Sequence, residues 1–380
     1  MKRETVFFSD GEGLWALRDG EVLPLASGRL EQYRRNLEEI RQRRQWKTDG
    51  PGAAFLGQTP TGEAPEVRPR IGGLALAEGS LYYTIHLDGV GSLCRRGPLD
   101  GTKPEGLVVS RRGMETFGLC WNGASFATTA AEGSARHLAF FTLPRGDLTV
   151  VTQGETVEST PSWSQDCQQV YFSSAGFGRD ASGRPAGLGP RALCRLDPNT
   201  MELFDLYGEA GRDCLSPQEG PDGLLYFLRR PRRENARSGG AADLVMAPVR
   251  MARAVGGWLD LFTRRYAGEP LRSGGDAKAK NRPEEELVIE GNLIRAGKVL
   301  EENRSRGEAY PGIIPASWEL ARMDPRHGGD PETVCKGVLA YLLLPDGDIL
   351  LSNGRHLLRR RPDGSQVLLA EHPLITLLAG

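Results

Sequence analysis

Short runs of alternating apolar and polar residues, separated by turn residues, dominate the chain. The clearest set begins at Glu158–Ser164, continues after a two-residue turn as Gln168–Ser173, and adds the runs Arg191–Asp197 and Met201–Leu206. Side chains that alternate along a strand face opposite sides of a sheet. Each run therefore predicts a half-buried strand, and together the four predict one antiparallel unit.

Units of this form recur about every 40–50 residues, which is the sequence signature of a β-propeller built from four-stranded blades. The other complete blades are predicted at Ile71–Ala77, Leu81–Leu87, Ser92–Arg96 and Gly106–Ser110; at Thr116–Trp121, Ser125–Thr129, His137–Leu143 and Asp147–Thr152; at Asp213–Pro217, Leu224–Arg229, Trp318–Met323 and Thr333–Cys335; and at Val338–Leu344, Asp348–Ser352, His356–Arg360 and Gln366–Ala370.

The two ends of the chain complement each other. Thr5–Ser9, Leu14–Arg18 and Glu21–Leu25 form three strands with no inner strand before them, and Pro373–Gly380 resembles an inner strand with nothing after it. Pairing of the two ends closes the ring and removes exposed sheet edges. The sequence predicts an all-β, six-bladed propeller closed by its C-terminal strand; an irregular all-β sandwich with helical insertions is the alternative.

One segment carries a resemblance to a known family. Thr160-Pro-Ser-Trp-Ser-Gln-Asp166, followed by Val170-Tyr-Phe-Ser-Ser174, resembles the repeat of TolB-like (PD40, WD-repeat-like) propellers, although Gln165 and Cys167 stand where that repeat has Pro and Gly. The other blades match by period and pattern alone. The resemblance implies a structural motif, in which Pro161 and Trp163 pack between blades and Asp166 shapes the turn, and it implies no catalytic residue.

Two insertions interrupt the repeat. The first covers residues 28–70 and contains a helix predicted at residues 29–46, with Ser27 as N-cap and with Leu30, Tyr33, Leu37 and Ile40 on one face. Two interpretations stay open for this helix: it covers the side or mouth of the ring, or it docks a partner.

The second insertion covers residues 230–315 within the fifth blade in chain order. Between Arg229 and Arg272 it contains ten arginines and four acidic residues, and an apolar stripe at helical spacing runs through Val245–Tyr266; Glu284–Arg304 is predicted to be partly helical. A positive face over a stripe packed on the ring, an acidic protein partner, and an anionic lipid or nucleic acid all remain open. The candidate partner contacts are Arg250, Arg253, Trp258, Arg264 and Arg265.

Residues suited to chemistry are scattered along the chain. The six cysteines and five histidines show no metal-ligand spacing, so neither a metal nor a cofactor is expected. The predicted inner strands begin near Arg70, Glu115, Glu158, Asp213 and Lys336, which are candidate ligand contacts at the mouth of the axial channel. Solvated rim charges are the alternative, and the mixed signs do not suit a calcium site.

Composition limits the functional classes. The formal net charge of −1 excludes a field over the whole protein that would attract nucleic acid or anionic lipid. No signal sequence or long apolar run is found, so we expect a cytoplasmic, monomeric protein without a transmembrane segment. The expected function is a non-catalytic scaffold that binds a protein partner through its insertions. The alternatives are a hydrolase or lyase that uses the axial channel, and a peripheral membrane or nucleic-acid binder.

Overall fold

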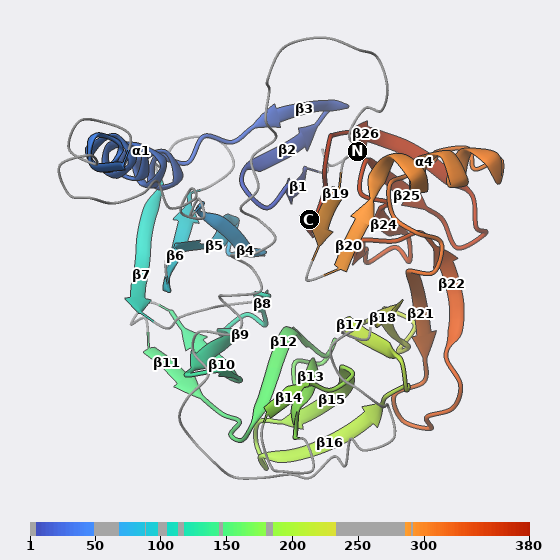
Figure 1. Ribbon diagram of the computed structural model, residues 1–380. Helices are drawn as coiled ribbons and strands as arrows, with labels where there is room; N and C mark the ends of the chain where they lie inside the picture. The colour runs from blue at the N-terminus through green and yellow to red at the C-terminus, as the bar shows by residue number, and fades with distance from the viewer. Residues whose placement is uncertain are drawn as a thin grey trace.

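Strands arranged in blades around a central space form most of the regular secondary structure that the computed structural model describes (Figure 1). It describes residues 5–48, 68–87, 89–97, 105–112, 118–143, 147–179, 185–232, 286–289 and 292–380. In the part of the chain that is described, four sheets have four strands each, in the orders β27–β1–β2–β3, β4–β5–β6–β7, β17–β18–β21–β22 and β23–β24–β25–β26. The fold is an all-β propeller arrangement.

The strands of these four sheets follow the predicted runs closely. Their bounds are β1 Val6–Ser9, β2 Leu14–Arg18, β3 Glu21–Pro24 and β27 Leu377–Ala379; β4 Arg70–Ala77, β5 Ser80–Leu87, β6 Val90–Arg96 and β7 Gly106–Arg112; β17 Arg212–Glu219, β18 Leu225–Pro231, β21 Glu319–Met323 and β22 Glu332–Lys336; and β23 Ala340–Leu343, β24 Ile349–Ser352, β25 His356–Arg360 and β26 Gln366–Glu371.

A fifth sheet runs through nine strands. Its members are β8 Cys120–Trp121, β9 Ser125–Glu132, β10 Ala135–Thr142, β11 Asp147–Val150, β12 Thr156–Trp163, β13 Val170–Arg179, β14 Pro185–Leu188, β15 Ala192–Asp197 and β16 Glu202–Tyr207. It consists of two successive sets of strands, β8–β11 and β12–β16, and a single parallel bridge between Arg136 and Val157 joins them. Strand β14 extends the second set by pairing with β13, and the sequence patterns did not predict it.

The C-terminal strand closes the ring. Strand β27 pairs with β1 in antiparallel register, with Phe7 opposite Ala379 and Phe8 opposite Leu378. The pairing joins the last residues of the chain to the first strand, and Thr376 also donates from its backbone N–H to the carbonyl of Ser9 at 2.8 Å. The inner edge of β1 is thereby covered instead of facing solvent.

The innermost strands carry a shared irregularity. The register of β12 shifts between Ser159 and Ser162, and that of β17 shifts between Leu215 and Gln218. At these bulges Thr160 and Ser216 have φ of +50° and +52°. L-residues with side chains seldom adopt this left-handed conformation because it costs about 1–2 kcal/mol. In both strands the residue that follows is a proline.

Hydrogen bonds link these inner strands from one blade to the next. The backbone N–H of Ser216 donates to Thr160 Oγ1 at 2.9 Å, and the hydroxyl of Tyr341 donates to the carbonyl of Ser216 at 2.5 Å. On the other side of the ring, Gly118 N–H donates to the carbonyl of Gly72 at 3.1 Å. The bulges therefore serve as contact points between blades around the central space.

Apolar side chains fill the space between adjacent blades. Trp163 stacks on Phe140 with ring centroids 5.1 Å apart, and a Cβ on Gly118 would lie 2.9 Å from Pro161 Cδ. Asp166 accepts hydrogen bonds from Ser164 Oγ and Gln168 N–H within its turn. The three residues of the repeat motif thus lie between blades or in the turn, as the resemblance implies.

Among the described residues, two helices and a hairpin lie outside the blades. Helix α1, Gly28–Thr48, matches the predicted helix within two residues at each end. The prediction for Glu284–Arg304 was only partly right, because this stretch forms the hairpin of β19 Glu286–Ile289 and β20 Asn292–Arg295 before helix α4, Ala296–Ser305. The predicted helical stripe in Val245–Tyr266 lies outside the described residues.

Candidate functional site

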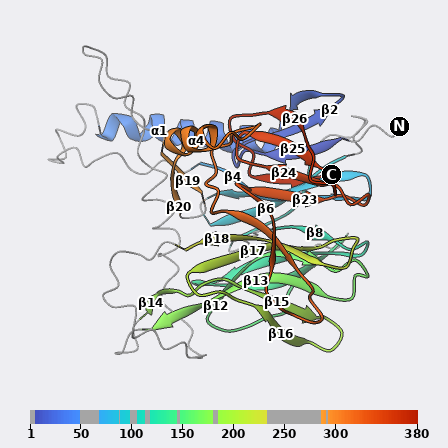
Figure 2. The same cartoon turned by 90° about the vertical axis from the view of Figure 1, so that its right-hand side faces the viewer.

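The long connections gather at one end of the ring. In an antiparallel four-stranded blade, the loops between second and third strands and the loops between blades lie at the same end. Figure 2 shows α1, α4, β14 and the β19–β20 hairpin at this end of the propeller. The strand order assigns the turns between first and second strands, such as those at Gly79 and Gly347, to the other end. We call the end that carries α1, β14, β19, β20 and α4 the insertion face.

Helix α1 is attached to the ring through its first two turns. Ser27 Oγ accepts the N–H of Leu30 at 3.2 Å, which makes Ser27 the N-cap, and it also accepts the hydroxyl of Tyr83. Ser27 Oγ donates to the carboxylate of Glu105 at 2.5 Å. Leu30 is buried among the side chains of the first two blades.

Farther along α1 the apolar side chains become more exposed. Tyr33 still packs against the core and its hydroxyl lies 3.0 Å from Ser92 Oγ, whereas Ile40 is 45% exposed. The apolar face predicted for this helix is therefore covered at its start and open toward its end. The helix projects outward from the ring in Figure 1.

The second insertion is fixed to the ring where it leaves and where it returns. Arg229 on β18 and Glu319 on β21 lie opposite each other in register and form an ion pair at 2.8 Å, and Arg212 binds the same carboxylate at 3.1 Å. Burial acts to raise the pKa of Glu319, but the hydrogen bonds and charges of the two arginines outweigh it, and the net direction is a lowered pKa. We call Arg212, Arg229 and Glu319 the insertion root.

The described end of this insertion packs on the ring. Ile294 of β20 and Val299 of α4 lie in one buried cluster with Ile314, Trp318 and Leu339. The guanidinium of Arg230, the residue before the end of β18, lies 4.8 Å from the centroid of the Trp318 ring. Residues 292–318 therefore form a packed base on the insertion face.

The residues predicted at the channel mouth do not form one cluster. Arg70 is exposed at the first position of β4, and Asp213 is half-buried in β17, where its carboxylate accepts the N–H of Arg191 at 3.0 Å. Glu115 lies outside the described residues. No hydrogen bond or ion pair joins any two of the remaining predicted mouth residues in the described ranges.

Glu158 was wrongly predicted at the mouth. It is only 3% exposed, and its carboxylate accepts hydrogen bonds from Leu138 N–H and Thr152 Oγ1, each at 2.5 Å. Burial raises its pKa, against the effect of these hydrogen bonds. The physical reason for the error is the strand start: β12 begins at Thr156, two residues before the predicted start, so Glu158 lies inside the strand beside β10 and not at its exposed end.

Lys336 was also misplaced. It is the last residue of β22, the outermost strand of its blade, where it lies opposite Glu319 in register. Gly337, with φ of +70°, turns the chain before the innermost strand β23 begins at Ala340. The apolar run that starts at Val338 had suggested an earlier strand start and placed Lys336 at the axis.

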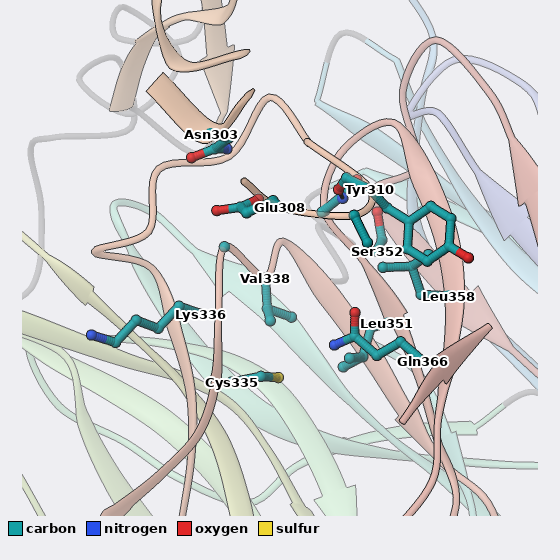
Figure 3. Close-up of a pocket in the computed structure, with 13 residues that line it drawn as sticks. Asn303, Glu308, Tyr310, Cys335, Lys336, Val338, Leu351, Ser352, Leu358 and Gln366 are labelled. Atoms are coloured by element: carbon teal, nitrogen blue, oxygen red, sulfur yellow. Dashed lines mark hydrogen bonds between the residues drawn. The ribbon is translucent and has the colours of Figure 1, made fainter. Parts of the chain in front are cut away.

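A cavity of about 280 Å³ lies where the second insertion meets the last two blades (Figure 3). One wall consists of residues 308–310, which follow α4, and another consists of residues 335–338 at the end of β22. Leu351 and Leu358 line it from β24 and β25. Sequence patterns did not reveal it, because its residues come from segments that are far apart along the chain.

Metal-ligating groups do not converge in the described part of the molecule. No group of three or more His, Cys, Asp or Glu side chains among the described residues could hold a metal ion. No described helix has the length and apolar character needed to cross a membrane. The predicted partner contacts Arg250, Arg253, Trp258, Arg264 and Arg265 all lie outside the described residues.

Comparison with known proteins gives similarity at the level of structure. No protein-family model matches the sequence, and no curated protein matches it significantly. A TolB from Acinetobacter baumannii is similar with a TM-score of 0.51 and 11% identity; the match covers 99% of this chain and 66% of that chain, so this chain spans just under two thirds of its length. A structure of a nidogen–laminin complex is similar with a TM-score of 0.51 and 8% identity, over 99% of this chain and 98% of that chain.

A gluconolactonase from Xanthomonas campestris is more distant. It has a TM-score of 0.43 and 12% identity, over 82% of this chain and 81% of that chain, and so loose a likeness supports no functional argument. At identities this low, the two better matches bear on the fold alone. The chain has a TolB-like β-propeller fold.

Proposed function

We propose that this chain is a six-bladed propeller scaffold of the TolB-like (PD40) type, which binds a protein partner through its insertion face and catalyses no reaction. The count of six treats the nine-stranded sheet as two blades, β8–β11 and β12–β16, because only the bridge between Arg136 and Val157 joins them. The first set has the four-strand order of the separate blades, and the second has it in β12–β13–β15–β16, with β14 paired to β13 in addition.

The observation that carries the proposal is the gathering of the long insertions on one face, on supports that hold them firmly. Helix α1 is anchored by Ser27 and Leu30, and the second insertion is anchored by the ion pairs of the insertion root. A partner that docks on pre-ordered elements loses less conformational entropy on binding. A scaffold function requires such an arrangement, whereas a ring that serves only as a spacer does not.

Charge indicates the kind of partner. The sequence between Arg229 and Arg272 has six more basic than acidic residues, in a chain whose net charge is −1. A protein with an acidic surface would be attracted to this segment and its encounter rate would fall with added salt. Arg250, Arg253 and Trp258 remain the predicted contacts within it, together with Arg264 and Arg265.

The test compares three tagged proteins in nuclease-treated native lysate. One is the wild type, the second has residues 233–285 replaced by a short Gly-Ser linker, and the control carries the same linker in the turn at Asp363–Ser365 on the opposite face. We expect a partner that the wild type and the control retain and the second protein loses. Thermal melting of all three shows that each is folded. Retention of the same partners by the second protein would contradict the proposal.

A further inference from the structure

The cavity beside the last two blades has the size of a small-molecule site. Its volume of about 280 Å³ is many times the roughly 30 Å³ that one water molecule occupies in the liquid. Ligand pockets in proteins begin at about this size and are lined mainly by apolar side chains, with a few polar groups that fix the orientation of the ligand.

The floor of the cavity is apolar. Val338, Leu351 and Leu358 are 3–4% exposed and belong to the apolar cluster between the last two blades. Cys335 lies beside them, and burial raises the pKa of its thiol to about 12, so it carries no charge at neutral pH. This floor favours an aliphatic or aromatic group.

The buried polar side chains of the cavity are already engaged. The amide of Asn303 donates to the carbonyls of Gly312 and Ile314, and that of Asn353 donates to the carbonyl of Tyr310 at 2.8 Å. Asn353 thereby holds Tyr310 of the wall in place, and Asn303 holds the segment that follows this wall. They therefore do not call for a polar ligand group inside the cavity.

Two groups of opposite charge stand at the rim. Glu308 follows α4 and Lys336 ends β22; both are exposed, and neither side chain forms a hydrogen bond or ion pair with another residue of the described ranges. Figure 3 shows the two side chains extending toward the same side of the cavity. Partial burial raises the pKa of Glu308, against the charge of Arg306, so a cation beside this carboxylate would stabilise its ionised form.

We propose that this cavity binds a zwitterion with an apolar side chain, of the size of an apolar amino acid or a short peptide. Its ammonium group would lie at Glu308, its carboxylate at Lys336, and its side chain on the floor formed by Val338, Leu351 and Leu358. The carboxylate of Glu308 would repel a simple anion, and the ammonium group of Lys336 would repel a simple cation. A zwitterion can pair with both charges. The proposal does not depend on the scaffold function.

Calorimetry on the purified full chain tests the proposal. The probes are L-phenylalanine, the dipeptide leucyl-leucine, phenethylamine, which lacks the carboxylate, and 3-phenylpropionate, which lacks the amine. We expect a zwitterion to bind and each analogue with one charge to bind about tenfold more weakly, since one charged hydrogen bond is lost. Comparison of the first two probes distinguishes a free amino acid from a peptide as the ligand.

Charge variants make the test specific. In Glu308→Gln the affinities for L-phenylalanine and 3-phenylpropionate should converge, and in Lys336→Gln those for L-phenylalanine and phenethylamine should converge. Glu202→Gln on β16 and Lys298→Gln on α4 are matched controls that should keep the wild-type preferences. Because the substituted side chains are exposed, all four variants should melt like the wild type. Failure of both zwitterions to bind, or unchanged preferences in Glu308→Gln and Lys336→Gln, would overturn the proposal.

Discussion

At the scale of single residues, the inner bulges are the feature that depends most on particular side chains. Thr160 and Ser216 hold positive φ values, and their atoms connect neighbouring inner strands. The sequence did not indicate this strain, because a residue before proline normally favours an extended conformation with negative φ. Contacts with other blades offset the cost of this backbone strain. A local sequence pattern does not show such contacts.

Gly118 provides a test of this crowding. A Cβ at this position would lie 2.8 Å from Thr160 Cα, whereas one at Gly123 would meet no atom within 4 Å, although both glycines have nearly the same φ of +100° and +95°. We expect Gly123→Ala to lower the free energy of unfolding by about 1–2 kcal/mol from backbone strain alone. Gly118→Ala should cost about 3 kcal/mol or more, because strain and overpacking add.

Chemical denaturation of the wild type and the two variants measures these costs. Equal losses in Gly118→Ala and Gly123→Ala would show that the close approach of Gly118 to the bulge at Thr160 does not hold in solution.

Glu158 gives a prediction about pH. Burial raises its pKa in the folded protein, so the folded state binds a proton more readily than the unfolded state does. The stabilising effect of protonation is fully present below the pKa of an unfolded glutamate, and it is lost as pH rises through the folded pKa. As pH rises from about 4, the wild type should therefore lose unfolding free energy relative to Glu158→Gln.

Urea denaturation across this pH range, with Glu202→Gln as an exposed control, follows the difference. A difference that stays constant or moves in the wild type's favour as pH rises would rule out this account of Glu158.

At the scale of elements, strands were easier to predict than the segments between them. The strand pairs β1–β2 and β25–β26 begin at or within one residue of the predicted positions, because alternation and flanking turn residues mark their ends. The stretch Glu284–Arg304 was predicted to be partly helical, and the sequence analysis missed the hairpin β19–β20 within it, although Gly291 between the two apolar runs is a hairpin signal. Its leucines and isoleucine fit a helical stripe equally well over so short a stretch.

The N-cap of α1 can be tested directly. Ser27→Ala removes the acceptor for Leu30 N–H and for the buried hydroxyl of Tyr83, and also the donor to Glu105. We expect the free energy of unfolding to fall by about 2 kcal/mol, at the upper end for loss of an N-cap, because buried partners are left unpaired. Ser305→Ala, at the exposed end of α4, is the matched control and should cost less than about 0.5 kcal/mol.

Thermal and denaturant unfolding of both variants measure these losses of stability. If Ser27→Ala is no less stable than Ser305→Ala, Ser27 does not anchor α1 to the ring.

At the scale of the whole molecule, the arrangement of strands decides where function can reside. Both predicted insertions leave and rejoin the blades at connections that the strand order brings to one face. The five residues predicted at the channel mouth are not brought together in this way. Glu158 is buried, and Lys336 lies at the end of an outer strand. A strand start predicted from sequence can differ by two residues from the observed start, which places Glu158 inside β12. The turn at Gly337 likewise leaves Lys336 at the end of the preceding strand, β22.

The cavity could not be predicted from the sequence either, because its walls come from segments that are far apart along the chain. Residues 308–310, 335–338 and 351–358 meet only because the insertion folds back on the last blade. Each segment alone resembles an ordinary turn or strand end. Only the assembled ring brings Glu308 and Lys336 to one rim.

The most direct test of the scaffold function is hydrogen–deuterium exchange of the purified chain, free and in complex with the partner captured from lysate. We predict protection of backbone amides in α1 and in residues 292–318 on the insertion face. The turns at Gly79, Gly223 and Gly347 on the opposite face should exchange equally in both samples. Protection confined to those turns, with no change on the insertion face, would contradict the central claim that the insertions recognise the partner.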